Sequence, residues 1–208
     1  AIIPIKSKSS RVKRKNFIKI KKNKPLYRYF LEKVLKCNFD QVFVDTDSIE
    51  IINFCKKRKI NIIKRKKSLA QDNANGNDLL NYHAKIIKSD LYFQLFITAP
   101  LLSVETINKS IYLLKTKKKF DSIFTCHKIF SWFWFNDRPV NYKPKILPRS
   151  QDAKPIVMET TGLYGIRKKT LKKHGCRIGQ KPYFLEVSKK ESLDLDTKED
   201  FKILKTYL

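Results

Sequence analysis

Short apolar runs alternate along the chain with stretches in which apolar residues recur every three or four positions. A short apolar run bounded by polar residues is typical of a buried strand, and the longer recurrence is typical of a helix with one buried face. The runs predict strands at 1–5, 41–45, 60–63, 91–97, 121–125, 158–166 and 183–187. The recurrence predicts helices at 25–35, 48–57, 77–87, 104–114, 168–174 and 197–207.

This alternation predicts the fold class. Strands and helices of these lengths in turn form βαβ units, whose strands lie parallel and whose helices cover the sheet. The chain has 208 residues, which is enough for one sizeable core. We therefore expect a Rossmann-like α/β fold, with a mostly parallel sheet and helices on both faces, as one domain over residues 1–208.

The pattern breaks between residues 126 and 158. Residues 131–139 carry aromatic side chains that would lie on both faces of a strand, and several prolines follow. This predicts an inserted arm or hairpin. A cluster as apolar as Trp132 to Phe135 must be covered by something. Two alternatives remain open: the cluster is a flap on the core of its own subunit, or it contacts a second subunit.

The charge of the chain constrains its partner. The net charge is +27, with 46 Lys plus Arg against 19 Asp plus Glu. Such a charge suggests a polyanion, and a basic nucleic-acid-binding module would show a steep loss of affinity with salt. However, lysines are spread over the whole chain and outnumber arginine, which specific nucleic-acid recognition prefers. The distribution argues against nucleic acid and agrees with a small anionic substrate.

Other patterns bear on location and on metals. No apolar run approaches the roughly 20 residues that cross a bilayer, so no membrane partner is expected. The first strand precedes the charged segment, which reverses the order of a signal peptide. The cysteines have no Cys-x-x-Cys spacing that would indicate zinc: Cys37, Cys55, Cys126 and Cys176. We expect a soluble, cytoplasmic protein with reduced thiols.

The first strand runs into a polar, basic loop. Ligands of open α/β folds bind at the carboxyl edge of the sheet, where this loop would begin. Bound triphosphate needs positive charge, which the loop supplies from Lys6, Lys8, Arg11, Lys13, Arg14 and Lys15. The alternative is a solvated basic loop, because the segment contains no glycine and matches neither a Walker nor a Gly-x-Gly-x-x-Gly pattern.

An acidic pair, Asp194 and Asp196, lies near the end of the chain. Residues two apart in an extended segment face the same way. Mg²⁺ prefers one or two carboxylates together with substrate phosphate oxygens, so the pair predicts a magnesium site. The alternative is that Asp196 or Thr197 caps the following helix, which leaves Asp194 unexplained. For Asp47, which follows the second strand, we favour a helix-capping role.

Segments in order along nearly the whole chain resemble the motifs of the acylneuraminate cytidylyltransferase family, which is related to the CMP-Kdo synthetases. Ile2-Ile3-Pro4-Ile5-Lys6-Ser7-Lys8-Ser9-Ser10, then Arg14-Lys15-Asn16, is similar to the family's Ile-Ile-Pro-Ala-Arg-Gly-Gly-Ser-Lys and Arg-Lys-Asn. Further similar segments are Lys24-Pro25-Leu26, Val42-Phe43-Val44-Asp45-Thr46-Asp47, Thr98-Ala99-Pro100-Leu101, Arg149-Ser150-Gln151-Asp152, Glu159-Thr160-Thr161-Gly162-Leu163-Tyr164 and Ser192-Leu193-Asp194-Leu195-Asp196.

The resemblance implies a nucleotidyltransferase domain and a reaction. The family couples CTP with a 2-keto-3-deoxy sugar acid, which is sialic, legionaminic, pseudaminic or Kdo-like, to give a CMP-sugar and pyrophosphate. Its members are homodimers whose arm reaches the partner subunit. By this resemblance, residues 126–158 form a dimer contact, and Trp132 to Phe135 lie in it.

The resemblance also implies roles for single residues. Catalytic roles fall to Lys6 and Lys15 on the phosphates and to Asp194 and Asp196 as the ligands of Mg²⁺. The residues implied to bind substrate are Ser9 in the triphosphate loop, Asn16 on the nucleotide, Arg65 with the 72–78 loop (Gly76 and Asp78 included) near the cytosine, and Gln151 with Tyr164 facing the sugar acid.

The chain departs from the family pattern at six positions that bear on activity. Lys6 replaces an arginine, Ser7 and Lys8 replace the loop glycines, Ser10 replaces a lysine, Phe96 replaces a glutamine, and Leu102 replaces a further arginine. If positions 7 and 8 need a positive φ, other residues there are strained. Two functions therefore stand beside each other: an active cytidylyltransferase, and a diverged, weakly active or inactive member that binds nucleotide or a partner.

Overall fold

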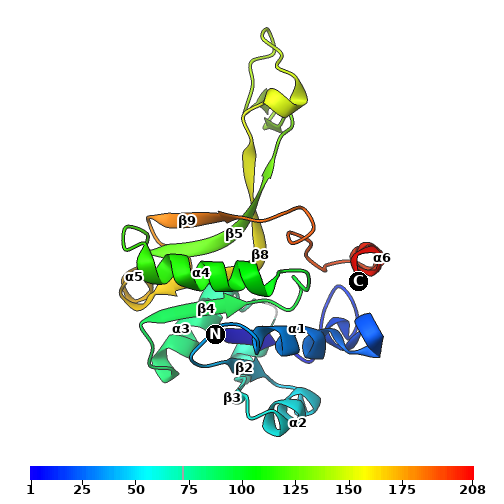
Figure 1. Ribbon diagram of the computed structural model, residues 1–208, viewed down its shortest axis with the longest axis vertical. Helices are drawn as coiled ribbons and strands as arrows, with labels where there is room; N and C mark the ends of the chain where they lie inside the picture. Colours follow the sequence, from blue (N-terminus) through cyan, green and yellow to red (C-terminus); the bar gives the residue numbers. More distant parts are fainter. Residues whose placement is uncertain (72) are drawn as a thin grey trace.

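The computed structural model describes residues 1–71 and 73–208. Its centre is a seven-stranded sheet with the strand order β3-β2-β1-β4-β8-β5-β9 (Figure 1). The strands of this sheet are β1 (Ile2–Ile5), β2 (Phe43–Thr46), β3 (Asn61–Lys64), β4 (Leu91–Leu95), β5 (Ser122–Ile129), β8 (Ile156–Arg167) and β9 (Pro182–Glu186). The α-helices are α1 (Leu26–Val34), α2 (Ile49–Lys57), α3 (Gly76–Ile86), α4 (Val104–Thr116), α5 (Lys168–His174) and α6 (Lys198–Tyr207). Every strand and helix that the sequence predicts is present, with boundaries shifted by a few residues.

The sheet is mostly parallel, as predicted. β1 pairs in parallel with β2 and β4, β2 with β3, and β5 with β9. β8 runs antiparallel to both of its neighbours, β4 and β5. The apolar pattern of a strand indicates burial and gives no direction, so the reversed strand was not foreseen.

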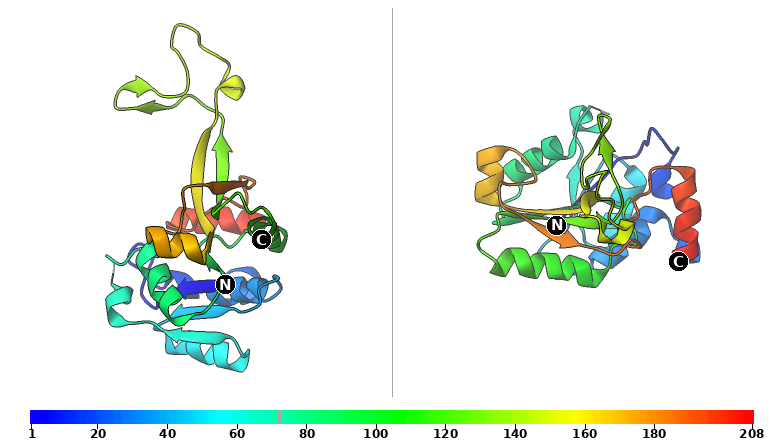
Figure 2. Two further views of the ribbon diagram at one scale, coloured as in Figure 1. Left: turned by 90° about the vertical axis from the view of Figure 1, so that its left-hand side faces the viewer. Right: turned by 90° about the horizontal axis from the view of Figure 1, so that it is seen from above.

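Helices cover both faces of the sheet because successive strand side chains point to opposite faces. In β1, Ile3 packs in the cluster that holds α1, α2, α4 and α6, whereas Ile2 packs with Leu80 of α3 and Leu171 of α5. Figure 2 shows α4 and α3 on opposite sides of the sheet. Among the described residues, no helix combines the length and the apolar character that crossing a membrane requires.

The parallel strands bring their carboxyl ends to one edge. The register places Ile5 beside Thr46 and Thr46 beside Lys64, so the segments that follow β1, β2 and β3 begin level with one another. The segment after β9 returns to the same edge, where the Leu195 N–H donates to Thr98 O at 2.8 Å. The basic loop and the acidic pair, far apart in the sequence, therefore meet here.

The helix caps correct two expectations. The side chain of Ser48, not of Asp47, accepts the Ile51 N–H at the start of α2, so the capping role predicted for Asp47 is wrong. Thr197 caps α6 in a reciprocal pair with Asp200, as one alternative predicted. Pro25 stands at the N-cap of α1, one position before the first turn in which it was expected.

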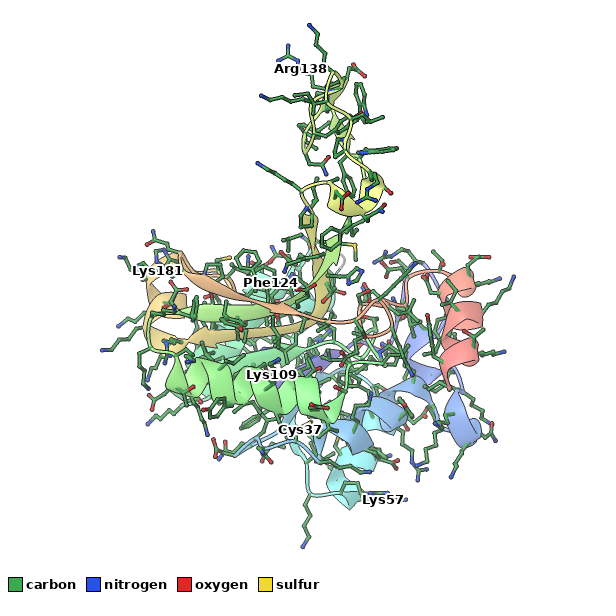
Figure 3. All side chains as sticks on the ribbon, turned by 45° about the horizontal axis from the view of Figure 1, so that its top comes forward. Cys37, Lys57, Lys109, Phe124, Arg138 and Lys181 are labelled. Carbon is green, nitrogen blue, oxygen red and sulfur yellow. The ribbon has the colours of Figure 1, made fainter. Side chains whose placement is uncertain are left out.

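An arm projects from the sheet between β5 and β8 (Figure 1). It contains the small hairpin of β6 (Trp134–Phe135) and β7 (Arg138–Pro139), and Figure 3 labels Arg138 far from Phe124 of the sheet. The Trp134 and Phe135 side chains are 60% and 69% exposed. Because the cluster is not packed on its own subunit, the flap alternative is wrong for this chain.

Candidate active site

A cleft of about 250 Å³ opens at the carboxyl edge of β1 to β4. Residues from the loop after β1, the end of β3, the start of α3 and the end of β4 form its walls. Among them are six of the residues that the resemblance marks as functional: Lys6, Ser9, Lys15, Asn16, Arg65 and Gly76. Of the other loop cations, Arg11 also lines the cleft, while Lys8, Lys13 and Arg14 do not.

The basic loop is anchored by Asp47, which lies just after β2. The Ser7 N–H donates to Asp47 Oδ1 and the Ser7 hydroxyl donates to Oδ2, both at 2.6 Å. Partial burial acts to raise the pKa of Asp47, but the bonds from Ser7 outweigh it and hold that pKa below its ordinary value. Neither Ser7 nor Lys8 has a positive φ. The loss of the two glycines therefore costs no backbone strain in this loop.

Lys15 joins the loop to the acidic segment. Its Nζ is buried and donates to Leu195 O at 2.5 Å and to Asp196 Oδ1 at 3.2 Å. An ammonium group has three N–H donors, so a third remains for a ligand in the cleft. Asn16 beside it donates from Nδ2 to Lys6 O at 2.8 Å and so fixes the turn of the loop.

The acidic pair splits into two different environments. Asp196 is paired with Lys15 and, through Oδ2, with Arg11 Nη1 at 2.5 Å. Asp194 accepts the Thr161 hydroxyl on Oδ2 at 2.7 Å, and its Oδ1 is buried without a hydrogen-bond partner in the described part of the chain. With α6 capped by Thr197, neither aspartate is needed as a cap.

These residues fit a magnesium ion. A buried carboxylate oxygen without a donor is a ready ligand for a hard cation. Asp196 would have to exchange the Arg11 pair, which is half exposed and therefore weakly held. Residues 1–71 and 73–208 contain no group of three or more His, Cys, Asp or Glu side chains that could hold a metal. A dication at Asp194 would thus draw its remaining ligands from substrate oxygens and water.

Arg65 is held rigidly at the cleft by a buried carboxylate. Its Nε donates to Asp45 Oδ2 and its Nη2 to Asp45 O, both at 3.1 Å. His83 Nε2 lies 3.0 Å from the same Oδ2, and all three side chains are buried. The sequence did not single out Asp45 or His83 for this role. His83 follows the helical spacing of apolar residues, which is also the pattern of an ordinary core position.

Five of the predicted residues do not line the cleft: Asp78, Gln151, Tyr164, Asp194 and Asp196. Asp78 belongs to the capping box of α3 with Asn75. Gln151 is exposed on the arm. Tyr164 is buried in the sheet and does not line the cleft. Asp72, part of the 72–78 loop, lies outside the described residues.

Tyr164 is buried beside the cleft and contacts two charged side chains that are partly exposed, Glu159 and Arg177. Its hydroxyl donates to Glu159 Oε1, and burial followed by this bond raises the pKa of Tyr164 well above its ordinary value. The Arg177 guanidinium lies over the Tyr164 ring at 3.6 Å from the centroid. Phe96, a cleft residue, meets the Tyr164 ring edge-on at 6.2 Å. Glu159 and Arg177 had no assigned role in the sequence analysis.

A cytidylyltransferase family model matches residues 1–205. The chain belongs to the cytidylyltransferase family. One relative is a Helicobacter pylori protein named pseudaminic acid cytidylyltransferase and UDP-2,4-diacetamido-2,4,6-trideoxy-β-L-altropyranose hydrolase. The chain is 27% identical to it over 213 residues, which cover 98% of this chain and 41% of that protein. It is 24% identical to N-acylneuraminate cytidylyltransferase A of Danio rerio, covering 98% of this chain and 49% of the relative. The chain thus spans less than half the length of either relative.

Solved structures agree on the fold of this chain. CMP:2-keto-3-deoxy-manno-octonic acid synthetase in complex with CTP is 17% identical, with a TM-score of 0.72 over 99% of this chain and 96% of that one. The 2-C-methyl-D-erythritol 4-phosphate cytidylyltransferase of Francisella tularensis is 17% identical, with a TM-score of 0.68 over 100% and 99% of the two chains. At this identity the likeness concerns the fold.

The contact between Ser7 and Asp47 predicts that Asp47→Ala will loosen the basic loop. An exposed charged contact contributes on the order of 1 kcal/mol or less, so amide hydrogen exchange in residues 6–16 should become up to about fivefold faster. Hydrogen exchange followed by mass spectrometry measures this. Asp40→Ala, which removes an exposed carboxylate paired with Lys115 at 4.0 Å, is the matched control and should leave the loop unchanged. Equal exchange in both variants would show that Asp47 does not anchor the loop.

Proposed function

We propose that this protein transfers a cytidylyl group from CTP to a 2-keto-3-deoxy sugar acid and releases pyrophosphate. The observation that carries the proposal is the contact of Lys15 with Leu195 and Asp196, which joins a basic loop to an acidic segment at one cleft. Membership of the cytidylyltransferase family supports CTP as the donor. The names of the two curated relatives support a nonulosonic acid of the pseudaminic or neuraminic type as the acceptor.

The cleft supplies what such a transfer needs. Lys6, Ser9 and Lys15 provide charge and donors for the triphosphate and stabilise the pyrophosphate as it leaves. Arg65 and Gly76 line the part of the cleft assigned to the cytosine. The anomeric hydroxyl of the acid attacks the α-phosphate in line, and positioning of the two substrates contributes much of the rate.

Mg²⁺ belongs to the same proposal. Asp194 and Asp196 would hold it, with the unpartnered Oδ1 of Asp194 as the first ligand. When bound, the ion supplies positive charge that offsets the charge of the phosphates. Before it binds, Arg11 and Lys15 neutralise Asp196 and keep the acidic segment folded against the loop.

The loop geometry favours an active enzyme over a diverged binder. The diverged-binder hypothesis rested on the altered loop, on Phe96 and on Leu102. Within the loop, neither Ser7 nor Lys8 adopts a conformation that needs glycine. Lys6 keeps the charge of the arginine that it replaces. A nucleic-acid-binding module, the third reading, leaves the acidic pair and the cleft without a role.

A homodimer in the cytoplasm completes the proposal. The exposed aromatic side chains of the arm are chemically suited to a second copy of the chain, because exposed apolar clusters of this kind mark interfaces. All four cysteines are unpaired, which suits a reducing compartment.

The reaction itself is tested by pyrophosphate release. With CTP and Mg²⁺, we expect release in the presence of one acid from a panel of sialic, legionaminic, pseudaminic and Kdo-type acids, and none without an acid. A coupled phosphate assay measures it, with UTP in place of CTP as the nucleotide control. Absence of release with all four acids would contradict the proposed function.

Asp194→Ala should reduce pyrophosphate release about a hundredfold or more, because a metal-bound phosphate loses several kcal/mol of stabilisation without its ligand. The melting temperature should change little, since the removed carboxylate makes one described hydrogen bond, to Thr161. Asp90→Ala, an exposed carboxylate at the opposite edge of the sheet, is the control. Turnover retained at saturating Mg²⁺ would refute the metal assignment.

Removing aromatic side chains from the arm should dissociate the dimer. In sedimentation equilibrium, we expect twice the monomer mass for the unsubstituted chain and the monomer mass for a Trp134→Ser, Phe135→Ser double variant. Tyr112→Ser, which removes an equally exposed aromatic from α4, should remain dimeric. A monomeric unsubstituted chain at micromolar concentration would exclude the dimer.

A further inference from the structure

Arg177 lies on the loop between α5 and β9, beside the cleft and not among the residues that line it. Its backbone N–H donates to Asn77 Oδ1 at 2.9 Å, which fixes the loop against the first turn of α3. The guanidinium carbon stands 3.6 Å from the Tyr164 ring centroid and 5.7 Å from that of Phe96. Only 22% of the side chain is exposed. The guanidinium therefore lies close over the Tyr164 ring, with the Phe96 ring farther away.

This guanidinium touches the wall of the cleft. A Cβ on Gly76 would lie 2.3 Å from Arg177 Nη1, so the arginine occupies the space beside a glycine that lines the cleft. Phe96, the second neighbour, lines the cleft as well. Any side chain at position 76 would displace the guanidinium from this place.

The polar partners recorded for Arg177 do not satisfy it. Across residues 1–71 and 73–208, its guanidinium donates no hydrogen bond, and its one ion pair joins Nη2 to Glu159 Oε1 at 3.7 Å. That oxygen already accepts the Tyr164 hydroxyl. A guanidinium has five N–H donors, and no nitrogen of Arg177 is among the described buried polar atoms without a partner, so its free donors are open to water or to a ligand. An anionic ligand with paired oxygens matches the geometry of these donors.

Phe96 leaves these donors available. At this position the resembling family has a glutamine, whose amide oxygen would offer Arg177 an acceptor. Phe96 presents an aromatic ring and no acceptor, so it attracts the cation without using its N–H groups. Phe96 in place of the family's glutamine thus leaves the N–H groups of Arg177 available to a ligand.

Two anions enter the proposed reaction, a triphosphate and a carboxylate. The triphosphate has Lys6 and Lys15 on the loop. Arg177 instead contacts Tyr164 and Glu159 of β8. Thr161 of the same strand donates its hydroxyl to Asp194, so β8 carries contacts both to Arg177 and to the candidate magnesium ligand. In a 2-keto sugar acid, the carboxyl carbon is bonded to the anomeric carbon that bears the attacking hydroxyl, so the carboxylate must bind beside the reacting centre.

We propose that Arg177 binds the carboxylate of the sugar acid and orients its anomeric hydroxyl toward the α-phosphate. This inference rests on the proposed function. It assigns a substrate-binding role to a residue outside every motif of the sequence, and it makes the carboxylate a requirement for recognition of the acceptor.

The test compares Arg177→Met and Arg177→Lys with the unsubstituted full-length chain in pyrophosphate release. The acid is the one of the panel that the unsubstituted chain uses. Arg177→Met should raise KM for the acid about tenfold or more, because it removes a charge-assisted pair, and leave KM for CTP within about twofold. Arg177→Lys should give an intermediate KM, since it keeps the charge and loses the paired donors. Arg58→Met, which removes a surface arginine at the C-cap of α2 paired with Glu32, is the matched control.

A carboxamide analogue of the same acid gives an independent readout. The unsubstituted chain should prefer the acid over its amide about tenfold or more, and Arg177→Met should lose this preference. A rise in KM for CTP alone would assign Arg177 to the phosphates and overturn the inference. Unchanged constants, or a lowered melting temperature with the preference retained, would show that Arg177 is only the counter-ion of Glu159. Failure of the unsubstituted chain with every acid would overturn the proposed function, and this inference with it.

Discussion

The buried ammonium group of Lys15 is the constraint on which the site depends. A cation removed from water needs acceptors, and Lys15 finds them 180 residues away, in Leu195 O and Asp196. Leu195 is itself buried, and its N–H is bonded to Thr98 O after β4. One side chain thus fixes the loop after β1, the end of β4 and the acidic segment relative to one another.

Three aspartates position the basic side chains and the basic loop around the cleft. Asp47 holds the loop through Ser7, Asp45 holds Arg65, and Asp196 holds Lys15 and Arg11. A net charge of +27 would otherwise spread the basic side chains into solvent. The acidic residues at the carboxyl edge therefore act as anchors, and each leaves a cation beside the cleft. The charge that matters for an anionic substrate is placed by a few of the 19 acidic residues.

The sequence was sufficient for the elements and for much of the cleft, since both follow from local patterns. Periodicity indicated each strand and helix, and the parallel fold brought Lys6, Lys15 and Arg65 to one edge. What it could not indicate were pairings between distant residues. The reversed direction of β8, the bond from Ser7 to Asp47, and the burial of Tyr164 under Arg177 all depend on contacts across the sheet. Motif resemblance also marked Asp78 as substrate-binding, where the structure uses it as a cap.

The glycine-free loop shows how a departure from a motif can be compensated. Glycine permits close approach and unusual φ, but it leaves a loop flexible before a ligand binds. Ser7 gives up that freedom and gains a hydroxyl that donates to Asp47. Because the loop is then held before the nucleotide arrives, less conformational entropy remains to be lost on binding. Phe96 makes a comparable contact on the other side of the cleft. Its ring lies near the Arg177 guanidinium and offers no hydrogen-bond acceptor, so it does not occupy the N–H groups of Arg177. In both places a residue that departs from the family motif takes part in a contact that orders the cleft.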